Sequence, residues 1–106
     1  MKKIIYAAVA VAALAFSGAV AADQVLAQQI GCMGCHKIDS KLIGPAFKDV
    51  AAKYRDTPNA AAMLTAKVKA GSKAGEPLIW GTMMMPASPA PEADVHKVIE
   101  WVLTLK

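Results

Sequence analysis

Two cysteines and a histidine stand together at residues 31–37, in the stretch GCMGCHK. Cys32 and Cys35 are the only cysteines in a chain of 106 residues, and His36 is one of its two histidines. A chain this short can bury only a small apolar core, so a further constraint such as a bound metal or a covalent link is expected. The use to which this motif is put therefore decides what the chain can fold around.

A Cys-x-x-Cys pair has three common uses in proteins. A redox dithiol favours a βαβ setting, and no convincing strand pattern occurs in this chain. A structural zinc site needs four protein ligands, and only His96 could add to those of the motif. The third use is covalent attachment of a c-type haem, for which Cys-x-x-Cys-His is the sequence signal. The motif predicts this third use, with a bare disulfide or dithiol as the alternative.

The spacing of the motif suits a porphyrin. Positions i and i+3 of one helical turn point the same way, so the sulfurs of Cys32 and Cys35 can bond one edge of the ring. The next residue, His36, can then lie over the ring and ligate the iron. An attached haem would also serve as a large apolar element of a small core.

The first residues have the layout of a secretory signal peptide. Two lysines precede an apolar run at residues 4–16, and small residues follow in an Ala-x-Ala pattern. The run is shorter than the ~20 apolar residues that a membrane-spanning helix needs. We predict a Sec-type signal peptide over residues 1–21, cleaved after Ala21 or Ala22, and one domain over residues 22–106.

Charge excludes some classes of partner. Loss of the two leader lysines lowers the formal net charge from +4 to +2. This small excess, with both signs mixed along the chain, differs from the basic stripe of a nucleic-acid-binding protein. We expect a periplasmic monomer that binds no nucleic acid and is not inserted in the membrane once the leader is removed.

The mature chain carries helix signals and no internal repeat. Pro45 can begin a helix, Asn59 can cap another, and Gly71 can end it. Residues 72–91 show neither the apolar period of a helix nor that of a strand, and they predict a long, ordered, functional loop. The last helix has an apolar stripe at helical spacing, formed by Val95, Val98, Ile99, Val102 and Leu105. The fold class is all-α, with about four helices around one centre, over residues 23–30, 45–54, 60–70 and 92–106.

A haem iron bound by His36 calls for a second axial partner, and methionine is one of the usual ones. His96 lies off the apolar stripe of its helix, which is typical of a solvated residue. The predicted loop contains Met83, Met84 and Met85, followed by a proline. Methionine is more often a core filler than a ligand. Three together in an irregular segment, however, favour a ligand presented by a loop.

Four stretches, in order and with near-matching spacing, carry a resemblance to a known family. They are Gly31–His36, Gly44–Ala51, Trp80–Gly81 leading to Met85–Pro86, and Trp101–Leu103. Over essentially the whole mature chain, they resemble the small class I mono-haem cytochromes c of the bacterial periplasm. The likeness is closest to short carriers that deliver electrons to nitrite reductase and to terminal oxidases. It implies the class I cytochrome c fold, with about four helices around one covalently attached haem c.

The resemblance also implies roles for individual residues. It implies His–Met coordination, in which Met85 is the axial methionine because a proline follows it directly, and Met84 is the alternative. Pro45 matches the residue whose carbonyl accepts the proton of His36 Nδ1, which would orient the imidazole ring.

Two further residues match positions near the haem propionates. Trp80 matches an indole that donates a hydrogen bond to a propionate, the alternative being a packing tryptophan. Lys67 lies where the family often has a cation near a propionate. The chain departs from the family pattern at residues 74–79, which are slightly longer, and at Ser88, where an asparagine often supports the methionine.

If protein ligands fill both axial positions of the haem iron, substrates cannot reach the metal. This favours electron transfer over oxygen or peroxide chemistry. The expected function is that of a soluble periplasmic electron carrier, and not of an enzyme. It would transfer one electron at a time between a respiratory-chain donor and a terminal reductase or oxidase. The alternatives are a haem enzyme or gas sensor with an open sixth site, and a haem-free thiol–disulfide protein.

Redox partners are expected to dock transiently at the exposed haem edge. An apolar patch of this kind is typical of a docking face. Lys37, Lys41 and Lys48 either steer acidic partners toward it or are plain solvated surface. Met33 and Gly34 hold the thioether side, and by resemblance Leu42, Ile43, Met83, Met84 and Pro86 surround it.

Overall fold

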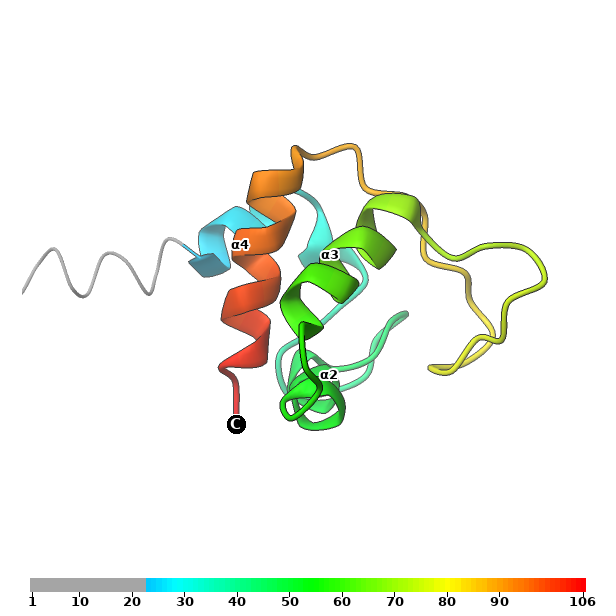
Figure 1. The fold of residues 1–106 in the computed structure, drawn as a ribbon, viewed down its shortest axis with the longest axis horizontal. Helices are drawn as coiled ribbons and strands as arrows, with labels where there is room; N and C mark the ends of the chain where they lie inside the picture. Colours follow the sequence, from blue (N-terminus) through cyan, green and yellow to red (C-terminus); the bar gives the residue numbers. More distant parts are fainter. Residues whose placement is uncertain (1–22) are drawn as a thin grey trace, which may run out of the picture.

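The computed structural model describes residues 23–106, and the predicted signal peptide, residues 1–21, lies outside this range. Their regular structure is helical and they contain no strand, which confirms the all-α prediction. A helical segment at residues 23–29 comes first (Figure 1). It is followed by η1 (Cys32–Gly34), α2 (Phe47–Tyr54), α3 (Ala60–Ala70) and α4 (Glu92–Leu103).

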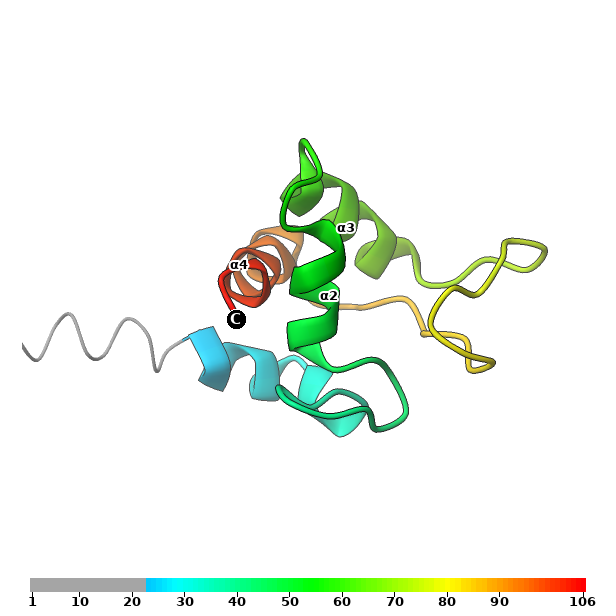
Figure 2. The ribbon, with the colours of Figure 1, turned by 90° about the horizontal axis from the view of Figure 1, so that it is seen from below.

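The apolar stripe of α4 forms the centre of the core. Figure 2, in which α4 is seen nearly end-on, shows α2 and α3 beside it, and α4 contacts both helices. Phe47 of α2 and Ala27 pack against one part of the stripe, and Leu64 of α3 packs against another. The buried residues of α4 are Val95, Val98, Ile99, Trp101 and Val102. The stripe was therefore predicted correctly along α4 itself.

Helix ends differ from the predictions by a few residues. α2 begins at Phe47 rather than Pro45, because Ala46 before it is extended at φ −60° and ψ 140°. Asn59 precedes α3 in the left-handed region at φ 57°, and its side chain makes no capping hydrogen bond. α4 ends at Leu103, and Leu105 beyond it is half-buried against the core.

The predicted loop is present at residues 71–91, where no helix or strand occurs. Gly71 ends α3 at φ 73°, as its position predicted. From there the chain runs out beyond the helices and returns to α4 (Figures 1 and 2). Across residues 23–106, no helix combines the length and the apolar character needed to cross a membrane.

Candidate functional site

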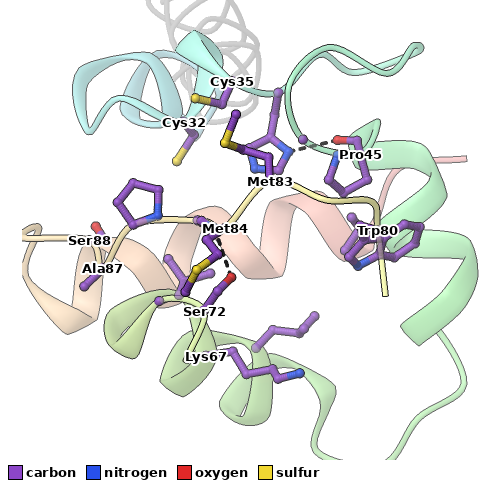
Figure 3. Close-up of a pocket in the computed structure, with 18 of the residues that line it drawn as sticks. Cys32, Cys35, Pro45, Lys67, Ser72, Trp80, Met83, Met84, Ala87 and Ser88 are labelled. Carbon is purple, nitrogen blue, oxygen red and sulfur yellow. Dashed lines mark hydrogen bonds between the residues drawn. The ribbon is translucent and has the colours of Figure 1, made fainter. Parts of the chain in front are cut away.

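A cavity of about 350 Å³ is lined by η1 on one side and by the loop at residues 71–91 on another. This volume falls within the range of small-molecule and cofactor sites. Figure 3 shows Cys32 and Cys35 on one side of the cavity, with Met84, Ser72 and Lys67 on the other. Every residue predicted for a haem site lines it, namely Cys32, Cys35, His36, Pro45, Lys67, Trp80, Met84 and Met85.

The motif forms one tight helical turn, as its spacing predicted. Gly31 enters the turn at φ 89°, a left-handed conformation that favours glycine. The carbonyl of Cys32 accepts the N–H groups of Cys35 at 3.2 Å and of His36 at 3.0 Å. Burial raises the pKa of the Cys32 thiol.

The ring of His36 is oriented by a backbone carbonyl. Its Nδ1 lies 2.8 Å from the carbonyl oxygen of Pro45, and Figure 3 marks this hydrogen bond. A carbonyl can only accept, so Nδ1 is the nitrogen that carries the proton. The lone pair of Nε2 is therefore available to a metal.

Two neighbours fix the ring of His36 further. Phe47 stacks on it, with centroids 4.9 Å apart and planes 19° apart, and itself meets Trp101 edge-on at 5.9 Å. Gly44 lies so close that a Cβ there would be 2.5 Å from Cε1 of His36. From the sequence, Gly44 and Phe47 stand out only as members of the Gly44–Ala51 stretch. A glycine placed directly before Pro45 was the one available hint of a close approach.

The three loop methionines differ in exposure. Met83 is 67% exposed and Met84 is 47% exposed, whereas Met85 is half-buried. Ser72 holds Met85 on both sides of its backbone. The N–H of Ser72 donates to the carbonyl of Met85 at 2.8 Å, and the N–H of Met85 donates to Ser72 Oγ at 2.9 Å.

The residues after Met85 lie against the end of α3. The N–H of Ser88 donates to the carbonyl of Val68 at 3.0 Å. The ammonium of Lys69 donates to the carbonyl of Ser88 at 3.1 Å and to that of Ala90. Sequence reasoning missed Ser72 and Lys69, because only the path of the loop brings them to Met85 and Ser88. The sole signal was a serine directly after the helix-ending glycine.

The remaining predicted residues are placed as follows. Trp80 is half-buried and Lys67 is exposed, both at the cavity, and their contacts with propionates stay predictions. His96 does not line the cavity, and its Nδ1 lies 3.1 Å from Oε1 of Glu100. Lys48 Nζ lies 2.6 Å from Oδ1 of Asp39.

The donor set around the cavity fits a c-type haem. One turn offers two thiols, His36 offers an imidazole with a free Nε2, and a loop offers methionine thioethers. Apolar side chains of α3 and α4 form one wall of the cavity, including Leu64, Val95, Val98, Ile99 and Val102. Within residues 23–106, no three His, Cys, Asp or Glu side chains gather as ligands for a metal ion.

Comparison with known proteins agrees with this geometry. The sequence profile of the family described as Cytochrome c matches residues 20–106. Cytochrome c-552 of Nitrosomonas europaea is 41% identical over 98 residues, which cover 92% of this chain and 91% of that protein. Cytochrome c-551 of Azotobacter vinelandii is 49% identical over 76 residues, covering 72% and 88%. The crystal structure of wild-type Nitrosomonas europaea cytochrome c552 superposes with a TM-score of 0.72 at 40% identity, covering 78% of this chain and 99% of that one. The chain therefore belongs to the cytochrome c family, as a small class I member with one covalently attached haem c.

Proposed function

We propose that this cytochrome carries single electrons in the periplasm, with His36 and Met85 as the axial ligands of its haem iron. The bound haem c supplies the one-electron chemistry. One observation carries the ligand assignment: His36, with Nε2 free, and Met85, the most buried of the loop methionines, line the same cavity. Met84 is the alternative ligand.

The chain's own residues hold the ligands and the ring. Cys32 and Cys35 attach the haem, and Pro45 fixes the proton of His36 on Nδ1. Trp80 and Lys67, which line the cavity, are assigned to the propionates. Two protein ligands leave no open position for a substrate, so the proposed role is electron transfer and not catalysis.

Exposed apolar residues support a docking role for one face. We define the docking patch as Met33, Leu42, Ile43, Met83, Met84 and Pro86. Within it, Leu42 is 42% exposed and Ile43 is 51% exposed, on a different segment from the exposed Met83 and Met84. Partly exposed apolar groups of this kind favour brief contacts with other redox proteins. Lys48 is paired with Asp39, so Lys37 and Lys41 are the better candidates for steering acidic partners.

The proposed setting follows the likeness to bacterial cytochromes c-551 and c-552. Residues 1–21 would direct export by the Sec route, and residues 22–106 would act as a soluble monomer. Its partners would be a respiratory-chain donor and a terminal reductase or oxidase. Membership of the cytochrome c family leaves no place for a haem-free thiol–disulfide protein.

A Met85→Ala variant tests the proposal, with Met84→Ala as its matched control. The oxidised Met85→Ala protein should lose the weak far-red absorption band of iron–methionine bonding, and its midpoint potential should fall. Met84→Ala should keep both. Loss of the band in Met84→Ala alone would move the ligand to Met84. Ready binding of carbon monoxide to the reduced wild-type protein would instead favour a haem enzyme or gas sensor with an open sixth site.

A further inference from the structure

The segment that follows the loop methionines is held by the end of α3. Ser72 makes two hydrogen bonds to Met85, one through its backbone N–H at 2.8 Å and one through its side-chain Oγ at 2.9 Å. Lys69 donates to the carbonyls of Ser88 and Ala90 from the last turn of α3. Figure 3 marks the bond at Ser72 with a dashed line.

These contacts replace the regular structure that the loop lacks. The last carbonyls of a helix have no partner within the helix, and the carbonyl of Val68 finds one in the N–H of Ser88 at 3.0 Å. Gly71 makes the approach possible, since a Cβ there would lie 2.6 Å from the backbone nitrogen of Ala87. Residues 85–90 are therefore held against the end of α3 by hydrogen bonds, and the backbone of Met85 itself is bonded to Ser72.

We propose that Ser72 and Lys69 are positioning residues that keep the Met85 thioether on the haem iron and so set how readily another ligand displaces it. The proposal rests on the assignment of Met85 as axial ligand. Neither side chain reaches the iron in this role. Ser72 fixes the backbone of Met85 itself, and Lys69 fixes the chain three to five residues beyond it.

The experiment is a titration of the oxidised holoprotein with imidazole. Loss of the far-red band reports the displacement of methionine from the iron. Imidazole competes with methionine for the iron. A methionine that is held less firmly therefore raises the apparent affinity of the protein for imidazole. Ser72→Ala removes the bond to the N–H of Met85 and should raise this affinity about threefold to tenfold, the effect of one ordinary hydrogen bond. Lys69→Met removes a charged donor and should raise it about tenfold or more.

Conservative variants separate positioning from general stability. Ser72→Thr keeps a hydroxyl and Lys69→Arg keeps donors, so both should restore an affinity close to that of the wild type. The matched control is Thr104→Ala, which removes a hydroxyl bonded to the carbonyl of Trp101 at 2.6 Å, away from the cavity. It should leave imidazole affinity unchanged, even where it lowers the free energy of unfolding. An affinity within twofold of wild type in both Ser72→Ala and Lys69→Met would overturn the proposal.

Amide hydrogen exchange in the reduced wild-type protein tests the same contact without any variant. The N–H of Met85 should exchange more slowly than an unprotected amide, because Ser72 Oγ accepts it. Exchange at the unprotected rate would overturn the role of Ser72. The assignment of Met85 as axial ligand has its own test. A wild-type protein that lacks the far-red band would contradict this assignment before any variant is made.

Discussion

The two sides of the cavity are built in different ways. On the histidine side, the ring of His36 bonds to the carbonyl of Pro45, stacks on the buried Phe47 and lies against Gly44. Phe47 in turn packs edge-on against Trp101 of α4, so this side is continuous with the apolar core. On the methionine side, the backbone of Met85 is held by two hydrogen bonds with Ser72, one donated by the N–H of Ser72 and one accepted by its Oγ.

This difference predicts which side of the cavity opens first when the protein is destabilised. Core packing resists change because every displaced atom loses many contacts. A few hydrogen bonds near the surface contribute about 1 kcal/mol each and can open locally. We expect the histidine side to fail only with the whole fold, and the methionine side to open before it.

The largest expected effect comes from Phe47→Ala, which breaks the link between His36 and the core. Large-to-small changes of buried phenylalanine destabilise by about 3–5 kcal/mol, because a cavity remains. Guanidinium unfolding of the holoprotein should show this loss, with haem absorbance and helical signal changing together. Phe47→Leu, which keeps most of the apolar contact, should lose less than half as much. Separate transitions for the two signals would show that the histidine side is independent of the core.

Gly71→Ala should act mainly on the methionine side. Its φ of 73° with ψ of −179° is a conformation that essentially only glycine adopts, at a cost to an L-residue of about 1–3 kcal/mol. The added Cβ would also lie 2.6 Å from Ala87 N, so the combined loss should be about 2–4 kcal/mol. The far-red band should disappear on heating well before the helical signal. Gly75→Ala is the control, because Gly75 also has a positive φ of 88° but open space around its Cβ. Equal effects of the two variants would refute the importance of the close approach.

Gly44→Ala tests how tightly the histidine side is packed. A Cβ 2.5 Å from Cε1 of His36 forces the ring to move, at an overpacking cost of about 1–3 kcal/mol. The Nδ1 proton of His36, followed by NMR in the reduced protein, should exchange faster as its bond to Pro45 weakens. Gly34→Ala provides the matched control, since no atom lies within 4 Å of its added Cβ. An unchanged exchange rate in Gly44→Ala would mean that Phe47 and Pro45 alone fix the ring.

The sequence predicted those features that rest on local patterns. The apolar stripe of α4 repeats at helical spacing, and the spacing of Cys32 and Cys35 matches the single turn that they form. The start of α2 was placed two residues early, because Pro45 is compatible with a helix's first turn. In the structure, the carbonyl of Pro45 bonds His36, and Ala46 is extended.

Contacts between distant residues could not be predicted in the same way. Ser72 meets Met85 across thirteen residues of irregular chain, and no periodic pattern relates two such positions. Lys69 lies nineteen residues from Ser88, and a lysine in the last turn of a helix is most often a solvated surface residue. Gly44 showed its role only once the path of the chain brought His36 against it.

The smallest effect on the fold is expected for Met83→Gln, which separates docking from ligation. Met83 is 67% exposed, so the free energy of unfolding should change by no more than about 0.5 kcal/mol, and the far-red band should stay. Electron self-exchange between two copies, measured by NMR, needs no identified partner and brings two docking patches together. Because contact must then desolvate an added amide, exchange should slow about threefold to tenfold. Met63→Gln, at a 37% exposed methionine of α3 away from the cavity, should leave the rate unchanged. A wild-type rate of electron self-exchange in Met83→Gln, as in Met63→Gln, would remove Met83 from the docking patch.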